Sequence, residues 1–316
     1  MSGYLKNGQW HEGWYDTNKT SGAFVRADSA FRNWIKADPS SRYPAAPGRY
    51  HLYVSLACPW AHRTIIARSL KRLESIISLS VVEPVMTQGW AFSKALPDHV
   101  NGFQFMHQLY TAAQADYTGR VLVPVLWDTV TRSIVSNESA DIVRMFDQEF
   151  TEWADNSIEL YPEALRKEID KINDFLYENI NNGVYRCGFA SRQDAYQAAF
   201  ENLFSALDWV ESRLAAHSFL LGDTITESDW RLFTTLARFD AVYVGHFKCN
   251  RNRIEDFPNL SRYLRQLYLQ PDIDDTVNID HIKRHYYLSH PHINPSGIVP
   301  AGPILRFCAP VGDDGS

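Results

Sequence analysis

The fold is decided by the stretch Ser55-Leu-Ala-Cys-Pro-Trp-Ala-His-Arg63, which joins a strand-like run to a helix-like run. Residues 50–55 (YHLYVS) form a short apolar run that suits a buried strand, and residues 59–71 carry apolar side chains at helical spacing. Proline is well suited to the first turn of a helix. The sequence therefore predicts a strand, a tight turn at Cys58 and a helix that begins at Pro59.

Cys58 is expected at the start of this helix, where its side chain can act as a nucleophile. The positive end of the helix dipole favours an anion, and a thiol in such a position can have its pKa lowered from about 8.5 to roughly 3.5–7.5. Ala61 stands where a second cysteine would complete a CxxC pair. A disulfide at Cys58 would therefore form with an external thiol. The alternative is a buried cysteine with a structural role only.

Further strands and a helix extend this unit. Apolar runs at residues 76–82, 121–127 and 132–135 predict three strands, and the pattern over 140–150 predicts a helix. A proline inside a strand-like run normally indicates an edge strand. Pro124 is interpreted instead as a candidate cis-proline at a functional turn.

The second half of the chain has a helical period. The expected helices are 165–181, 192–217, 229–243 and 259–270. Thr226-Glu-Ser-Asp229 resembles a capping box at the start of one of them. The pattern predicts an α/β unit followed by an all-helical domain.

The 316 residues are long for a single hydrophobic core. We expect an N-terminal arm over 1–47, an α/β domain over 48–152, an all-helical domain over 153–290 and an irregular tail over 291–316. The arm should pack on the body through its aromatic residues, which are Trp10, Trp14, Phe24, Phe31 and Trp34.

Composition and charge argue against several classes of protein. The net charge of -6 argues against nucleic acid as a partner, and the chain lacks the run of about 18 apolar residues that a membrane-spanning helix needs. The four cysteines lie far apart with no His/Cys cluster, which argues against a disulfide framework and against a metal site. The first residues show no signal or transit pattern. We expect a soluble, cytoplasmic protein.

Several segments together form a recognisable pattern. They are Cys58-Pro-Trp-Ala-His-Arg63, Tyr117-Thr-Gly-Arg-Val121, Val123-Pro-Val-Leu-Trp-Asp128, Ser136-Asn-Glu-Ser139, Asn182-Gly-Val-Tyr-Arg-Cys-Gly-Phe-Ala190, Tyr243-Val-Gly-His-Phe-Lys-Cys-Asn250 and His281-Ile-Lys-Arg-His-Tyr-Tyr287. This pattern resembles the cysteine-type glutathione transferases, and among them the glutathionyl-hydroquinone reductases, or xi class. The resemblance implies a thioredoxin-like N-terminal domain, an all-α glutathione-transferase C-terminal domain and a homodimer. It also implies glutathione as a co-substrate, with no covalently bound cofactor.

The resemblance implies a glutathione site in the first domain. Its residues are Trp90, Arg120, Val121, Leu122, Val123, Glu138 and Ser139. Glutathione carries two carboxylates and one ammonium, so Arg120 suits a carboxylate and Glu138 suits the ammonium. Ser139 and the N–H groups of the following helix suit the γ-glutamyl carboxylate. The backbone of residues 121–123 can pair with the peptide as an added strand.

Each of these residues also has an ordinary structural interpretation. Trp90 could be a packed aromatic and Arg120 a surface charge, while Glu138 and Ser139 could form a plain helix start. Leu122 stands where the family pattern has threonine, which changes little if only backbone atoms bind.

Three tyrosines match the hydroquinone site of the family. They are Tyr185, Tyr243 and Tyr286. Tyr185 resembles the proton donor to the departing ring carbon, and the other two resemble hydroxyls that help to hold the cysteine thiolate. With 16 tyrosines in the chain, each could instead be a half-buried core residue. His62 and His285 are expected to be structural, and the cysteines other than Cys58 to be small buried hydrophobes.

The implied activity is the glutathione-dependent reduction of glutathionyl-hydroquinones. The Cys58 thiolate attacks the glutathionyl sulfur, Tyr185 protonates the hydroquinone, and a second glutathione releases oxidised glutathione from the mixed disulfide. One alternative is an omega-like thioltransferase or dehydroascorbate reductase, which uses the same cysteine without the three tyrosines. The other is a non-catalytic scaffold, which needs no thiol at this position.

Overall fold

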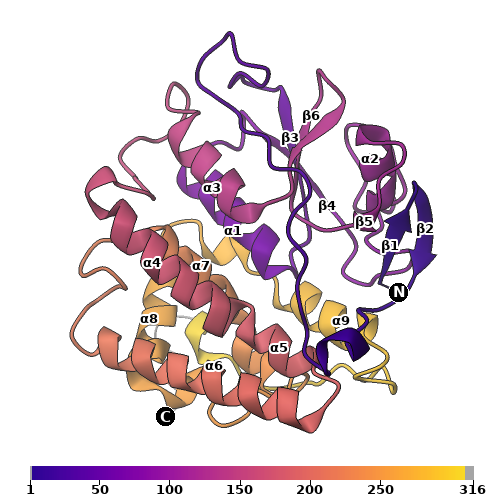
Figure 1. The fold of residues 1–316 in the computed structure, drawn as a ribbon. Coiled ribbons are helices and arrows are strands. Elements are labelled where there is room, and N and C mark those ends of the chain that lie inside the picture. Colours follow the sequence, from indigo (N-terminus) through magenta and orange to yellow (C-terminus); the bar gives the residue numbers. More distant parts are fainter. Residues whose placement is uncertain (1, 310–316) are drawn as a thin grey trace. The chain divides into compact units, whose positions relative to one another are not determined.

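The computed structural model describes residues 2–309, which group into two compact units (Figure 1). The first unit consists of the residues up to Tyr15 together with Ala27–Leu160 and Asp280–Ile298. The second consists of Asp16–Arg26, Tyr161–Ile279 and the residues from Val299 onward. Both units are assembled from separate segments of the chain, whereas the domains predicted from the sequence are continuous.

A four-stranded sheet forms the centre of the first unit. Its strands are β3 (Tyr50–Val54), β4 (Ser78–Val81), β6 (Val125–Asp128) and β7 (Ser133–Ser136). Their order is β4-β3-β6-β7, with β4 parallel to β3 and the other two pairs antiparallel. All residues of β3 and β6 are buried, which explains why both strands have apolar runs without alternation.

Three helices flank this sheet. They are α1 (Pro59–Leu70), α2 (Met106–Ala113) and α3 (Ser139–Gln148). Figure 1 shows α1 and α3, which pack against each other, on one side of the sheet and α2 on the other. The predicted helices at 59–71 and 140–150 are confirmed. The helix α2 was not predicted from the sequence, because only three of its eight residues are buried and so the apolar period is short.

The strand predicted over residues 121–127 is wrong in its first half. β6 begins at Val125, and the two-residue strand β5 (Gly119–Arg120) belongs to a separate sheet. Pro124 has no N–H to donate to a strand ladder. The Val123–Pro124 peptide bond is cis, which is the geometry predicted for this proline.

The arm contains a hairpin that the sequence analysis missed. β1 (Gly3–Lys6) pairs with β2 (Gln9–Glu12) and, on its other edge, with β5. The turn between the two strands is Asn7-Gly8, and both residues have positive φ angles of 48° and 74°. Asn-Gly is the strongest short signal for such a turn, so the hairpin was open to prediction.

The aromatic residues of the arm pack as predicted, each within its own unit. The contacts are Trp10 with His107, Trp14 with His292, Phe31 with Tyr117, Phe24 with Phe189, and the Trp34 indole N–H with the Glu149 carboxylate. The arm is therefore a packed part of the structure over most of its length.

The second unit is helical. Its main helices are α4 (Arg166–Leu176), α5 (Gly183–Phe189), α6 (Gln193–Leu214), α7 (Glu227–Arg238) and α8 (Pro258–Tyr268), and α9 (Ile279–Ser289) lies in the first unit apart from its first residue. Short 3₁₀ helices are η1 (Asn18–Thr20), η2 (Glu163–Leu165), η5 (Ile254–Asp256), η6 (Asp274–Thr276) and η7 (Arg306–Cys308). The predicted capping box is present at α7, where the Thr226 N–H donates to Asp229 at 2.8 Å.

Two π-helical turns interrupt the regular helices. They are η3 (Tyr177–Asn181) and η4 (Phe239–Tyr243), which follow α4 and α7 directly. The Asn181 amide donates to the Arg231 carbonyl at 3.0 Å and to the Thr235 hydroxyl at 2.9 Å, so η3 is tied to α7. Such turns are rare and frequently lie at functional sites.

Residues 2–309 offer neither a membrane-spanning helix nor a cluster of metal ligands. No helix in this part of the chain is long and apolar enough to cross a membrane. The same residues contain no group of three or more His, Cys, Asp or Glu side chains arranged to hold a metal ion.

Cys187 and Cys249 are buried as predicted, but Cys308 is partly exposed, so the expectation of burial is wrong for Cys308.

β3 carries a fully buried histidine, His51. Its Nδ1 atom lies 2.6 Å from the Ser78 hydroxyl and its Nε2 atom 2.8 Å from the Ser80 hydroxyl. Burial lowers the pKa of His51 to about 4. Histidine in an unfolded chain has a pKa of about 6.5. Between these two values the unfolded state binds a proton that the folded state does not, so stability falls as the pH falls.

We predict that lowering the pH from 7 to 5 removes about 2 kcal/mol of unfolding free energy through His51 alone. His51→Gln should show a correspondingly smaller difference between the two pH values in urea denaturation. The exposed His217 provides the matched control, and His217→Gln should keep the wild-type difference. Equal pH dependence in His51→Gln and wild type would contradict a neutral His51 in the fold.

Candidate active site

Cys58 lies at the N-terminus of α1, as the sequence predicts. It is the N-cap residue, and its carbonyl accepts the first helical bond from the His62 N–H at 3.0 Å. Its side chain is 9% exposed, and Sγ lies 3.6 Å from the Val123 carbonyl oxygen. The first N–H groups of a helix have no partner within it. The Cys58 sulfur is therefore at the positive end of the helix dipole, an environment that stabilises a thiolate.

The segment that carries Val123 is held from behind by a tyrosine of α2. The Leu122 N–H donates to the Tyr110 hydroxyl at 3.1 Å, and the Leu122 carbonyl accepts from the same hydroxyl at 2.9 Å. Of the three residues expected to offer backbone atoms, Leu122 therefore has both its polar groups paired inside the unit. The Val123 carbonyl oxygen faces the Cys58 sulfur instead.

Tyr110 is the centre of a chain of hydrogen bonds. Its hydroxyl also accepts from the Asn137 amide at 3.0 Å, and Asn137 accepts from the Phe31 N–H at 3.0 Å. Burial raises the pKa of Tyr110 well above its usual range, so the hydroxyl stays protonated. The chain connects the arm, the start of α3 and the segment beside Cys58. Tyr110 was not predicted from the sequence, although Asn137 lies in the segment Ser136-Asn-Glu-Ser139, which is part of the family pattern.

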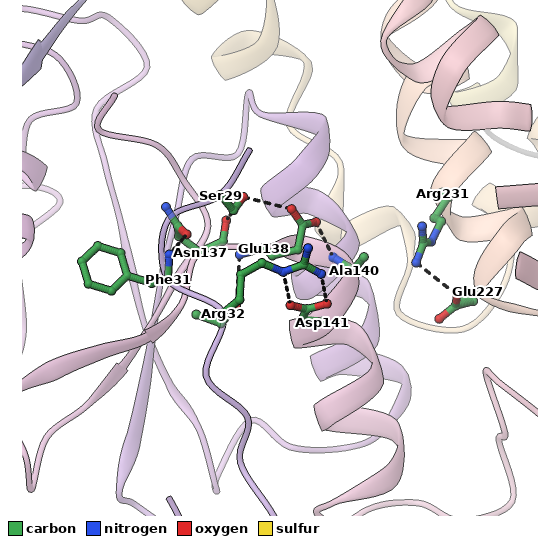
Figure 2. A network of polar contacts seen from close by, with 10 residues as sticks. Ser29, Phe31, Arg32, Asn137, Glu138, Ala140, Asp141, Glu227 and Arg231 are labelled. Carbon is green, nitrogen blue, oxygen red and sulfur yellow. Dashed lines mark hydrogen bonds and ion pairs between the residues drawn. The ribbon is translucent and has the colours of Figure 1, made fainter. Parts of the chain in front are cut away.

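Glu138 and Ser139 form the start of α3, where the arm also binds. The Glu138 carboxylate accepts from the Ala140 N–H at 3.0 Å and from the Ser29 hydroxyl at 2.9 Å. Figure 2 shows Ser29 of the arm reaching this helix start, with the Arg32–Asp141 ion pair in the same first turn of α3. The capping role is thus observed. It leaves lone pairs of the carboxylate for a further donor, since a carboxylate has about four.

Arg120 binds the N-terminal hairpin. Its Nη1 atom donates to the carbonyls of Gly13 at 2.7 Å and Gly3 at 3.1 Å. Its Cζ atom lies 4.2 Å from the centre of the Tyr15 ring and 5.4 Å from that of Tyr4. Burial lowers the pKa of Arg120. This role, which commits one of the two terminal nitrogens of Arg120 to the arm, was not predicted from the sequence.

Trp90 and Tyr286 both contact His285. The Trp90 ring stacks on His285 with centres 4.6 Å apart and an angle of 22°. The His285 Nδ1 atom lies 2.9 Å from the Pro84 carbonyl, which can only accept, so Nδ1 carries the proton. The Tyr286 ring centre is 5.2 Å from that of His285, and Tyr286 is 1% exposed. His285 thus has a structural role beside two candidate site residues.

The other two candidate tyrosines lie together in the second unit. Tyr185 belongs to α5 and Tyr243 ends η4, and their ring centres are 6.1 Å apart. Phe247 packs on both, with ring centres 5.5 Å from Tyr185 and 5.4 Å from Tyr243. Both tyrosines are buried. The candidate site residues therefore fall into two groups, one in each unit.

Comparisons with known proteins identify the family. The chain matches the glutathione S-transferase N-terminal domain over residues 57–149 and the C-terminal domain over 193–266. Glutathionyl-hydroquinone reductase YqjG of Escherichia coli K12 is 49% identical, covering 99% of this chain and 98% of its own. Glutathionyl-hydroquinone reductase PcpF of Sphingobium chlorophenolicum is also 49% identical, covering 95% and 96%. The chain belongs to the glutathionyl-hydroquinone reductase family.

A solved structure agrees with this assignment. The glutathione-bound structure of YqjG matches with a TM-score of 0.89 at 46% identity, over 99% of both chains. The glutathionyl-hydroquinone reductase family and the two-part glutathione-transferase fold, both implied by the sequence resemblance, are thereby confirmed.

We predict that Tyr110→Phe lowers the unfolding free energy by about 3 kcal/mol, because it leaves two backbone groups of Leu122 and the Asn137 amide without their buried partner. Amide hydrogen exchange over residues 121–123 should also become faster. Tyr50 offers a matched control, since its buried hydroxyl donates to one carbonyl only, that of Pro44. Tyr50→Phe should cost about 1 kcal/mol and leave this exchange unchanged. Equal effects of the two substitutions would contradict a central role for Tyr110.

Proposed function

We propose that this protein reduces glutathionyl-hydroquinones to hydroquinones with glutathione as co-substrate and Cys58 as nucleophile. One observation carries the proposal. Cys58 begins α1 with its sulfur 3.6 Å from the Val123 carbonyl, in a chain 49% identical to two glutathionyl-hydroquinone reductases over nearly its whole length. The solved glutathione complex of YqjG supports glutathione as the ligand.

In the proposed complex the peptide of glutathione pairs with the backbone of Val121 and Val123, next to the Cys58 sulfur. Its γ-glutamyl carboxylate binds Ser139 and the N–H groups at the start of α3. Its ammonium binds the Glu138 carboxylate, whose remaining lone pairs suit a cation.

Two further residues would complete this site. Trp90, fixed by its stack on His285, forms a wall of the site. The N–H groups of Arg120 other than those on Nη1 reach the second carboxylate, because Nη1 already donates to the arm.

The proposed reaction has two steps. The Cys58 thiolate attacks the glutathionyl sulfur, the carbon–sulfur bond breaks, and its electron pair goes to the ring carbon, which takes a proton from Tyr185. The sulfur is oxidised to the Cys58–glutathione mixed disulfide and the ring is reduced to the hydroquinone. A second glutathione then attacks the mixed disulfide, which releases oxidised glutathione and restores the thiolate.

Tyr243 and Tyr286 have a different proposed role. The family resemblance implies that their hydroxyls help to hold the Cys58 thiolate, and hydrogen bonds to the charged form of a group favour that form. Both would therefore lower the pKa of Cys58 and assist every reaction that begins with its attack.

The same proposal includes a homodimer in the cytoplasm. The dimer follows from the family resemblance. The reducing compartment is supported by the four cysteines, among which the structure forms no disulfide although all four lie in its described part.

We predict that Cys58→Ser lowers turnover of both glutathionyl-menadiol and a glutathionylated peptide by at least about 10³-fold, since the serine hydroxyl is a far weaker nucleophile. The melting temperature should stay close to wild type. The partly exposed Cys308 offers a control, and Cys308→Ser should keep both activities. Activity retained in Cys58→Ser, with the glutathione adduct found on another cysteine by mass spectrometry, would contradict the assignment.

A second prediction separates the hydroquinone reductase from a thioltransferase. Breaking a carbon–sulfur bond leaves a carbon that needs a proton, whereas reducing a disulfide expels a stable thiolate. Tyr185→Phe should therefore lose about 10²–10⁴-fold on glutathionyl-menadiol, the usual size of general acid catalysis, and keep most of its activity on the glutathionylated peptide. Tyr161, equally buried with its hydroxyl bound to Asp170, provides the control. Tyr161→Phe should change neither rate.

Two results would count against this assignment. Equal losses on both substrates in Tyr185→Phe would exclude a specific acid role for Tyr185. Full activity of wild type on the peptide with none on glutathionyl-menadiol would favour the thioltransferase.

A further inference from the structure

Residues 16–26 of the arm belong to the second unit and bring a cation to the ring of Tyr185. The Arg26 Cζ atom lies 4.9 Å from the centre of this ring. Its Nε atom donates to the Asn182 side-chain oxygen at 3.1 Å. Asn182 is the N-cap of α5, three residues before Tyr185. The guanidinium is therefore fixed both to the start of the helix and to the tyrosine that the helix carries.

The segment that presents Arg26 is itself held in place. The hydroxyls of Thr17 and Ser191 lie 2.8 Å apart, and the Ser191 N–H donates to the Gly22 carbonyl at 3.0 Å. Phe24 is 2% exposed and packs edge-on against Phe189 at 5.2 Å. These contacts surround the residues directly before Arg26. The packing of the preceding segment therefore fixes the position of Arg26 over the Tyr185 ring.

The surroundings of the Tyr185 ring strengthen an interaction with a charge. Phe189, Phe247 and Tyr243 pack on this ring, with centres 5.6, 5.5 and 6.1 Å away. Aromatic neighbours exclude water, so a charge near the ring is screened less than at the surface. The neighbouring Arg186 forms an ion pair with Glu178, in which Nη1 lies 2.5 Å from Oε1 and both side chains are partly exposed.

We propose that Arg26 is a positioning residue for proton transfer by Tyr185. It orients the phenol ring and stabilises the phenolate that remains once the proton has gone to the ring carbon of the substrate. This inference rests on the proposed function. With the neutral phenol the observed contact is a cation–π interaction with the ring, whereas the phenolate adds a charge–charge attraction. Arg26 therefore stabilises the transition state of proton transfer more than the ground state, which raises kcat.

The proton is accounted for over the full cycle. Tyr185 gives its proton to the ring carbon as the carbon–sulfur bond breaks and becomes a phenolate beside Arg26. The second glutathione must lose its thiol proton before it attacks the mixed disulfide, and this proton returns to Tyr185. Reduction of a glutathionylated peptide takes no proton from Tyr185, so the effect of Arg26 is confined to carbon–sulfur cleavage.

The test compares the full-length wild type with Arg26→Met and Arg26→Lys on two substrates. In Arg26→Met we expect kcat on glutathionyl-menadiol to fall about tenfold, within the range of a desolvated cation–π contact, with KM within about twofold of wild type. Arg26→Lys restores the charge and should recover most of the loss. Both variants should reduce the glutathionylated peptide at the wild-type rate. Arg26→Gln, which keeps a donor for Asn182, replaces the methionine variant if that fails to fold.

Arg166 provides the matched control. Its Cζ atom lies 5.2 Å from the Tyr161 ring centre in the same unit, and Arg166 is partly buried like Arg26. Arg166→Met should change neither activity. Combining Arg26→Met with Tyr185→Phe should give no loss beyond that of Tyr185→Phe alone, because the proposed effect acts through the Tyr185 proton.

The possible failures are distinguishable. Equal losses of Arg26→Met on both substrates, or a further loss in the Tyr185→Phe background, would overturn the role of Arg26 and leave the proposed function intact. A wild-type protein that reduces the peptide but not glutathionyl-menadiol would overturn the proposed function, and the role of Arg26 with it.

Discussion

The start of α1 is the constraint on which the rest of the first unit depends. Helix starts favour a residue whose side-chain oxygen accepts one of the unpaired N–H groups. α1 begins with Cys58, which forms no such bond, while α3 begins with Glu138, which does. The positive end of α1 therefore favours an anion at the Cys58 sulfur, whereas that of α3 is already partly balanced by a carboxylate. Two helix starts in one unit thus favour different chemical groups.

A sulfur anion is useful only if the backbone beside it keeps its place. The segment 121–123 lies between two sheets and belongs to neither, so no strand ladder holds it. One buried hydroxyl, that of Tyr110, replaces the ladder by pairing with both polar groups of Leu122. The same hydroxyl is linked through Asn137 to the arm. The geometry around Cys58 therefore depends on residues that never touch its sulfur.

The secondary structure was predicted best where a periodic run of apolar residues coincides with a signal for the end of a helix or strand. Both were present at the starts of α1 and α3, so the positions of Cys58 and Glu138 could be read in advance. The prediction failed at residues 121–127, where the run continues through a proline that ends the strand. The contacts of Tyr110 and Arg26 with distant parts of the chain could not be predicted, because periodicity describes one helix or strand at a time. Arg26 and its partner Asn182, for example, are 156 residues apart.

The N-terminal arm contacts candidate site residues in both units. The matches to the glutathione S-transferase domains begin at residue 57, so the arm lies outside both. Yet Ser29 bonds the carboxylate that caps α3, and Arg26 covers the ring of Tyr185. The domains common to the superfamily thus provide the thiol and the helix starts, while the arm adds contacts to a candidate group in each unit. Under the proposed function, the contact of Arg26 bears on the one step that separates a hydroquinone reductase from a thioltransferase, since a proton donor is needed only when a carbon–sulfur bond breaks.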